Sequence, residues 1–467
     1  MAATRIERDS MGEVAVPAAA YWGAQTARAL ANFRISTLRL PAPLIAALGR
    51  VKAAAARVNR ALGELDPGIA DAIERAALEV AAGRFDGEFV VDVFQTGSGT
   101  SSNMNANEVI ANRALEILGR PRGDRATIHP NDHVNRGQSS NDVFPTAIHL
   151  AAYERITVAL VPALERLAAA FEERAAATAD VVKPGRTHLQ GAVPITLGDE
   201  LSGYAAVARQ GIARVSDALA RLGEVPIGGT AVGTGLGTSP RFGALVLDEL
   251  VRLTGLPLQV ARNRFEAMQN RDAVVEASGM LRTIAVGLMK IANDLRLLAS
   301  DARTGIGELV LPALQPGSSI MPGKVNPVIP EAMTQVAALV IGHDTTITVA
   351  GLNGSLELNV MMPVMAHALL ESIEVLANGA TVLADRCVAG LVPDAARCRL
   401  LAERSPALVT ALVPRLGYDR AAELFRAAVA RDVPLREVLI AEGGIDAAEV
   451  DRLLDLHALA RGGGGGN

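Results

Sequence analysis

Three segments of this chain interrupt apolar, helix-forming sequence with dense hydroxyl and amide side chains. The first is residues 96–105, TGSGTSSNMN, where Gly permits tight turns and Ser, Thr and Asn supply neutral donors. Such donors at a helix start can hold a carboxylate, although a run of this composition alone is more often an ordinary capped loop. This segment alone therefore does not predict a binding site for a small anion. It does so only if other polar segments of the chain contribute to the same site.

The second segment is residues 129–142, which begins HPNDHVN and ends QSSND. His129 and His133 have a spacing that could bind a metal ion, but Pro130 opposes a regular helix and no third ligand is spaced to join them. We therefore predict no metal site here and a second set of neutral donors at a helix start. The expected donors are Ser139, Ser140 and Asn141.

The third segment is residues 317–327, GSSIMPGKVNP. Gly317 and Gly323 could hinge a mobile loop, and Lys324 adds a fixed cation. The segment is not a phosphate-binding loop, because Val325 occupies the position at which that motif needs a hydroxyl group. A lysine in a Gly-rich loop is more often solvated than catalytic. A catalytic role for this segment is therefore predicted only together with the other polar segments.

A single histidine, His188, lies between the second and third segments in the run GRTHLQ. A lone histidine is usually structural or exposed. The four segments taken together nevertheless favour an active site over four unrelated loops.

The composition predicts a mainly helical protein that acts on small molecules. Of its 467 residues, 50% are apolar and only 3% are aromatic, and the apolar residues fall in long stretches without Gly or Pro. The formal net charge is -5, with 45 basic and 50 acidic residues interspersed, so no field attracts nucleic acid or anionic lipid. Two cysteines without CxxC spacing, no signal peptide and no long apolar run lead us to expect a cytoplasmic protein away from membranes.

The elements that must position the polar segments are predicted to form three domains. Residues 1–140 are broken often by Gly and Pro, which predicts short helices and loops with substrate-binding segments. Residues 141–391 contain five long helical stretches, and the clearest, residues 272–300, has apolar residues in the 3,4,3,4 spacing of a bundle seam. Residues 392–467 predict a small helical domain with a flexible Gly tail. The expected fold is all-α, around a central bundle of five long helices.

Residues 317–326 are similar to the signature loop of the fumarase/aspartase superfamily, whose members form or cleave a bond beta to a carboxylate. Further motifs match in the same order over nearly the whole chain. They are WGAQT from Trp22, QTGSGT from Gln95, QSSND from Gln138, GGTAVGTG from Gly228 and KIAND from Lys290.

Within that superfamily the sequence resembles class II fumarase more closely than aspartate ammonia-lyase. His129, Ser140 and His188 match fumarase, where the ammonia-lyase pattern has Asn, Thr and Gln. Gly323 also agrees with fumarase, whereas His133 replaces an Asp that is typical of fumarases. The alternatives are an ammonia-lyase and a catalytically inert helical scaffold of the same superfamily. Other departures, none at a group that the chemistry requires, are Ser101, Gly137, Gly237, Asp301 and Ala302.

The resemblance implies reversible hydration of fumarate to L-malate, in the tricarboxylic acid cycle, by a homotetramer without metal or cofactor. Ser318 and His188 are the two candidates for the base that acts on carbon, and we favour Ser318. His188, paired with Glu331, would then handle the proton of the hydroxyl group.

The resemblance also implies which residues hold the substrate. Lys324 and Asn326 would clamp the carboxylate that gains charge. A second anionic site near the entrance would consist of His129, Asn131 and Asp132, although a capped surface turn explains these three residues equally well. The other implied substrate-binding residues are Ser98, Thr100, Ser139, Ser140, Asn141, Thr187 and Ser319.

Overall fold

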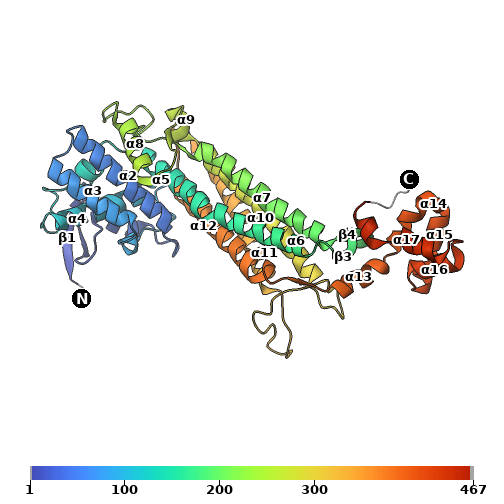
Figure 1. The fold of residues 1–467 in the computed structure, drawn as a ribbon. Helices are drawn as coiled ribbons and strands as arrows, with labels where there is room; N and C mark the ends of the chain where they lie inside the picture. Colours follow the sequence, from blue (N-terminus) through green and yellow to red (C-terminus); the bar gives the residue numbers. More distant parts are fainter. Residues whose placement is uncertain (1–2, 463–467) are drawn as a thin grey trace. The chain divides into compact units, whose positions relative to one another are not determined.

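The chain is mainly helical, as predicted, and its strands pair into short two-stranded sheets (Figure 1). The computed structural model describes residues 3–462, so the predicted Gly tail lies outside the described residues except for Gly462. Contacts between residues group the chain into two compact units, and the boundaries of the three predicted domains stay a prediction. Of the described residues, unit 1 comprises 3–162, 213–283 and 338–377, and unit 2 comprises 163–212, 284–337 and 378–462.

Unit 1 begins with a hairpin and helices that are longer than those predicted for residues 1–140. Helix α2 (Ala42–Ala61) continues through Gly49, a residue that weakens an isolated helix. Here it is needed, because a Cβ would lie 2.8 Å from the carbonyl oxygen of Ala77 in α3 (Pro67–Ala81). This glycine therefore marks a close approach of two helices. The other elements are β1 (Thr4–Asp9), β2 (Gly12–Pro17), α1 (Ala24–Asn32), η1 (Asp86–Glu88) and α4 (Thr100–Ile117).

Long helices follow, and the clearest of the predicted stretches, residues 272–300, agrees with α10 to within two residues. In α10 (Asp272–Leu298) every residue of the predicted seam is buried, from Val274 at 0% exposed to Leu298 at 5%. The periodicity therefore identified the buried face of this helix correctly. The other long elements are α5 (Ser140–Arg155), η3 (Ile156–Leu160), α6 (Val161–Ala177), α7 (Leu197–Leu222), α11 (Val328–Gly351), α12 (Met362–Leu383) and η4 (Ala384–Val388).

Residues 140–177 form a continuous helical stretch that widens to a π-helix over Ile156–Leu160. The widening precedes Pro162, which has no N–H to continue the α-helical ladder. By length and by a mean hydropathy of 1.3 this stretch could cross a membrane, contrary to the expectation that no apolar run is long enough. Because 61% of its most apolar window is buried inside the protein, the finding argues only weakly for a membrane span.

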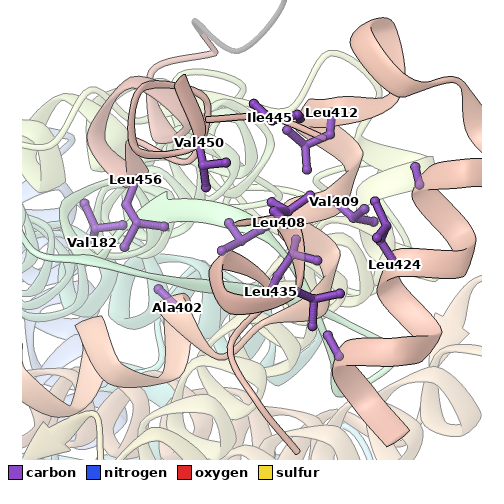
Figure 2. Packing of buried hydrophobic residues seen from close by; sticks show 14 residues of the cluster. Val182, Ala402, Leu408, Val409, Leu412, Leu424, Leu435, Ile445, Val450 and Leu456 are labelled. Atoms are coloured by element: carbon purple, nitrogen blue, oxygen red, sulfur yellow. The ribbon is translucent and has the colours of Figure 1, made fainter. Parts of the chain in front are cut away.

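The C-terminal helices of unit 2 pack around an apolar cluster of their own (Figure 2). Leu412 and Leu439 are completely buried in it. Val182 of β3 (Val182–Thr187) and Ala402 of α13 (Ala395–Glu403) belong to the same cluster, so the base of β3 is anchored in this core. The remaining elements here are η5 (Pro406–Leu412), α14 (Val413–Leu416), α15 (Tyr418–Arg431), α16 (Leu435–Glu442), α17 (Ala447–Leu453) and α18 (Leu456–Ala460).

Short elements connect the helices. β3 pairs with β4 (Gln190–Thr196) in an antiparallel hairpin of unit 2, interrupted by a bulge between Pro184 and Arg186. Strands β5 and β6 pair in parallel. The other connecting elements are η2 (Pro130–Val134), β5 (Glu224–Val225), α8 (Phe242–Thr254), β6 (Gln259–Val260), α9 (Arg264–Gln269), β7 (Leu309–Val310), β8 (Gly354–Ser355), β9 (Leu358–Asn359) and β10 (Val392–Pro393).

Candidate active site

The start of α4 brings three hydroxyl groups of unit 1 into contact. Ser98 Oγ lies 2.7 Å from Thr100 Oγ1, which in turn lies 2.7 Å from Oγ of Ser140 at the start of α5. Ser98 is buried, and the other two side chains are partly exposed. The first and second polar segments therefore meet as neutral donors beside two helix N-termini, an arrangement suited to a carboxylate.

Two glycines permit this approach. Gly99 has a φ of +75°, and a Cβ there would lie 2.4 Å from the ring of Phe144. At Gly97 a Cβ would lie 1.6 Å from the carbonyl oxygen of Val360, and the backbone N–H of Met362 donates to Gly97 O at 3.0 Å. Backbone therefore packs directly on backbone behind the hydroxyl groups, and only glycine fits at residue 97.

Substitution of Gly97 by Ala should lower the thermal midpoint of unfolding, because the new Cβ forces two backbone segments apart. Overpacking of this kind costs about 1–3 kcal/mol. Gly87→Ala is the matched control, since a Cβ at Gly87 meets no heavy atom within 4 Å. Calorimetric midpoints that are equal for the two variants would contradict the role given to Gly97.

Helix α5 begins at a capped donor segment. Oγ of Ser139 accepts the N–H of Asn141 at 3.2 Å, and the N–H of Ser139 donates to Asp142 Oδ1 at 3.0 Å, which closes a capping box. Asp142 is fully buried, and its Oδ2 accepts the N–H groups of Gly228 and Thr230 at 3.0 and 2.9 Å. Burial raises the pKa of Asp142 to about 6, although these hydrogen bonds act in the opposite direction.

The Gly-rich motif that begins at Gly228 thus holds the donor segment in place. The side-chain amide of Asn141 donates to the carbonyl oxygen of Ala231 at 2.9 Å, so the side chains of Asn141 and Asp142 both bond to the backbone of this motif. The resemblance alone gave this motif no role. The buried carboxylate of Asp142 was not predicted, although its capping-box spacing from Ser139 is the signal that could have revealed it.

A cavity of about 300 Å³ adjoins His129 and Asn131, two of the three residues predicted for the second anionic site. Arg8 and Arg125 also line it and supply positive charge, and the carboxylate of Asp9, a further lining residue, is paired with Arg28. Asp132 is not among its lining residues in the part of the chain that the structure describes. Burial lowers the pKa of His129, whose Nδ1 accepts the N–H groups of Asn131 and Asp132 at 3.2 and 3.3 Å.

His133, the residue that departs from the fumarase pattern, has a structural contact. Its Nδ1 accepts the backbone N–H of His129 at 2.7 Å, at the start of the π-helical turn η2, which begins at Pro130. Nδ1 of His129 and Nδ1 of His133 therefore both accept backbone N–H groups. Within residues 3–462, no group of three or more His, Cys, Asp or Glu side chains is arranged to hold a metal ion.

The hairpin of β3 and β4 presents Thr187 and His188 at its tip in unit 2. Thr187 pairs with Gln190, and the two residues between them have positive φ, +55° for His188 and +60° for Leu189. A turn with two positive φ values matches the twist of a hairpin, but it strains residues other than Gly. The hairpin therefore holds an exposed His188 in a conformation that a free chain avoids.

Ion pairs with buried charged groups stabilise the strand that leads to the tip of this hairpin. The guanidinium group of Arg186 binds both oxygens of Glu308, at 3.0 and 2.7 Å, and Glu308 is completely buried. Nζ of Lys183, in the same strand, lies 3.2 Å from Glu308 and 3.1 Å from Glu200. Because a bidentate pair fixes orientation, the residue next to Thr187 is held rigidly.

The third polar segment forms a loop that turns its own N–H groups onto Ser318. Ser318 Oγ accepts the backbone N–H of Ile320 at 3.2 Å and of Met321 at 2.9 Å. The loop is closed at its base, where the N–H of Gly317 donates to the carbonyl oxygen of Lys324 at 2.7 Å. Hydrogen bonds from backbone donors stabilise an oxyanion, so the loop favours ionisation of the Ser318 hydroxyl group.

Asn326 closes the loop base, and Lys324 and Ser319 stay exposed. The side-chain amide of Asn326 donates to the carbonyl oxygen of Gly317 at 2.6 Å. Glu331 lies in the first turn of α11. Among residues 3–462 no ion pair joins Glu331 to His188 within this single chain, so their predicted pairing stays a prediction. The hydroxyl groups of Ser98, Thr100 and Ser140 thus meet in unit 1, and the His188 hairpin and the Ser318 loop both belong to unit 2.

Two family models match this chain, one described as lyase over residues 12–342 and one as fumarase C C-terminus over residues 408–461. Among solved structures, the chain is similar to a class II fumarase from Schistosoma mansoni, with a TM-score of 0.95 at 38% identity, covering 98% of this chain and 99% of that one. A fumarate lyase:delta crystallin from Brucella melitensis bound to cobalt gives a TM-score of 0.93 at 49% identity, covering 98% and 100%. The fold and the site therefore define a lyase of the mainly-α, fumarase/aspartase kind.

The particular family follows from the curated relatives. A fumarate hydratase class II from Corynebacterium efficiens is 53% identical over 98% of this chain and 96% of its own length. One from Bordetella parapertussis is 51% identical over 96% of each chain. The chain belongs to the class II fumarate hydratase family.

Proposed function

We propose that this protein is a hydro-lyase that interconverts fumarate and L-malate. Its membership of the class II fumarate hydratase family supports the reaction. The structural observation that carries the proposal is the pair of backbone N–H groups on Ser318 Oγ, at 3.2 and 2.9 Å. A serine in ordinary surroundings is too weak a base for this chemistry, and these donors stabilise its ionised form.

The reaction needs a base aimed at carbon, because dehydration of malate removes a carbon-bound proton beside a carboxylate that is already negative. Ser318 takes that proton, and the charge that develops on the carboxylate is held by Lys324 and Asn326. His188 transfers the proton of the departing hydroxyl group, with Glu331 as its partner. The neutral hydroxyl groups of Ser98, Thr100 and Ser140, already linked at 2.7 Å, support a role in binding the other carboxylate.

The remaining implied residues complete this binding site. Ser139, Asn141, Thr187 and Ser319 donate to the two carboxylates. His129, Asn131 and Asp132 form the second anionic site, which the cations that line the adjoining cavity support. Ammonia-lyase activity was the alternative suggested by His133, but that side chain accepts a backbone N–H at 2.7 Å and so has a structural role that favours neither reaction.

The same proposal includes assembly and location. The protein acts as a homotetramer in the cytoplasm, in the tricarboxylic acid cycle, without metal, cofactor, nucleic acid or membrane. Exposed apolar residues on the long helices support burial against other subunits, as an exposed Val286 (54%) and Leu297 (43%) on α10 illustrate.

Consumption of fumarate with and without ammonia tests the reaction. We expect malate to form at the same rate in both, with no aspartate, as measured by chromatography. A chelator should leave the rate unchanged because the chemistry uses no metal. Aspartate formation would identify an ammonia-lyase, no turnover would identify an inert scaffold, and inhibition reversed by a divalent metal would refute metal independence.

A further inference from the structure

The side chain of Lys52 in α2 is completely buried, although Val51 precedes it and four Ala residues follow it. A buried ammonium group is costly unless acceptors satisfy it. Its Nζ donates to Oδ1 of Asn135 at 2.8 Å and to Oε1 of Gln138 at 2.9 Å. These acceptors are neutral amides in the turn that leads directly into Ser139, so a buried cation contacts the base of the donor segment.

The amide of Asn135 is oriented toward Lys52 by its other contacts. Its Nδ2 donates to the carbonyl oxygen of Gln138 at 3.0 Å, which leaves Oδ1 to accept. The side-chain amides of Asn103 and Asn107 in α4 donate to the same Oδ1, each at 3.1 Å. One oxygen thus collects donors from α2 and α4, and the ammonium group is the charged one among them.

The amide of Gln138 is fixed in the same way. Its Nε2 donates to the carbonyl oxygens of Val134 and Arg136, at 3.0 and 3.2 Å, so its Oε1 must accept. Lys52 fills that acceptor. The hydrogen-bond pattern of residues 134–138 therefore requires a donor at the position of Lys52.

Asp142, in the first turn of α5, is the charged group that acts on Lys52. Burial lowers the pKa of Lys52 to about 7, and the charge of Asp142 opposes this shift. In turn, Lys52 favours the ionised form of Asp142, whose carboxylate closes the capping box of α5. A buried cation and a buried anion therefore flank residues 138–142.

We propose that Lys52 is a positioning residue for substrate binding, whose ammonium group orders the turn of residues 134–138 and thereby fixes the donors of Ser139, Ser140 and Asn141. This inference rests on the proposed function, because it takes a dicarboxylate as the bound anion. Lys52 does not touch the substrate, since its side chain is completely buried. It acts by holding the donors and through its charge in a low-dielectric interior, where electrostatic effects are strong.

Replacement of Lys52 by Met removes both the hydrogen bonds and the charge. We expect KM for fumarate to rise about 10- to 100-fold and kcat to change less than about threefold, because donors that hold a carboxylate equally in ground and transition states affect KM. Lys52→Gln keeps two N–H donors without the charge and should give an intermediate KM. An unchanged KM in Lys52→Met at about pH 6.5 would overturn the proposal.

The pH dependence of KM separates a positioning role from a merely structural one. The ammonium group is present below about pH 7 and lost above it, so KM of the wild type should rise between pH 6 and 8.5, by about tenfold. In Lys52→Arg the side chain stays charged throughout, and this rise should be absent. Asp142 titrates in both proteins. A Lys52→Arg protein that keeps the wild-type rise would overturn the proposal.

Asn59→Ala is the matched control, because Asn59 Nδ2 also joins α2 to this turn, by donating to Arg136 O at 2.9 Å, but carries no charge. It should keep the pH dependence of the wild type. If Lys52→Arg does not fold, Lys52→Gln replaces it, and a pH-dependent rise of KM in that variant counts against the proposal.

A wild type without fumarate turnover would refute the proposed function and leave the role of Lys52 open to a different measurement. Amide hydrogen exchange of residues 134–142 needs no substrate. We expect exchange there to be at least about tenfold faster in Lys52→Met than in the wild type. Equal exchange rates would overturn the ordering role of Lys52.

Discussion

Ser318→Ala should lower the turnover of fumarate and of L-malate by about 100- to 10,000-fold, which is the usual effect of removing a group that transfers a proton. The substitution removes the oxygen that accepts two loop N–H groups, at 3.2 and 2.9 Å, and leaves the rest of the loop in place. The closure of the loop base by Gly317 and Lys324 does not involve this side chain. The fold and the thermal midpoint should therefore stay close to those of the wild type.

Steady-state kinetics in both directions measures this effect, with KM and kcat determined separately. Loss of a transition-state interaction lowers kcat and kcat/KM together. Ser202→Ala is a suitable control, since it removes an exposed hydroxyl group in the same unit that donates to Asp199 O at 2.7 Å. Turnover of Ser318→Ala within about tenfold of the control would remove Ser318 from the mechanism and leave His188 as the base.

The features that could be predicted from the sequence are those that local residues determine. The seam of α10 was predictable because its period is that of a helix face, and the seam residues between Val274 and Leu298 are buried accordingly. The start of α5 was predictable from its run of hydroxyl and amide donors, and the capping-box spacing of Ser139 and Asp142 is a second local signal for it. The loop of residues 317–326 was found by its resemblance to a known signature.

The features that escaped prediction depend on residues far apart in the chain. Gly97 packs against Val360, and no periodicity in either segment indicates that contact. Lys52 lies in an Ala-rich helix, where a lysine normally faces solvent, and only the fold brings it to Asn135. Likewise, the frequent Gly and Pro of residues 1–140 predicted short helices, whereas Gly49 allows the long helix α2 to approach α3 closely. In each of these three cases, tertiary packing determines the role of the residue, and the local sequence pattern does not indicate that role.

His188→Asn should also lower turnover by about 100- to 10,000-fold, because asparagine cannot take up and release a proton near neutral pH. The side chain keeps a size close to that of histidine, and Asn tolerates the positive φ of +55° at this turn. The hairpin should therefore keep its fold. A variant of near-normal turnover would exclude His188 from proton transfer.

These two inactive variants together test whether each active site is shared between subunits. The family resemblance implies that one site takes the Ser139 segment, the His188 hairpin and the Ser318 loop from three different subunits of a tetramer. Exposed apolar side chains at both tips support burial by other subunits, since Leu189 is 73% and Ile320 is 84% exposed in the single chain. Each variant tetramer alone is then inactive at every site.

If the Ser318→Ala and His188→Asn proteins are dissociated, mixed equally and reassembled, activity should return to about a quarter of the wild-type value. A given site receives an intact Ser318 with a probability of about one half and an intact His188 with the same probability, and the two are independent when they come from different subunits. Differently tagged subunits verify that mixed tetramers form. Mixed tetramers that remain inactive would mean that both residues come from one subunit, because no chain in the mixture carries both residues intact.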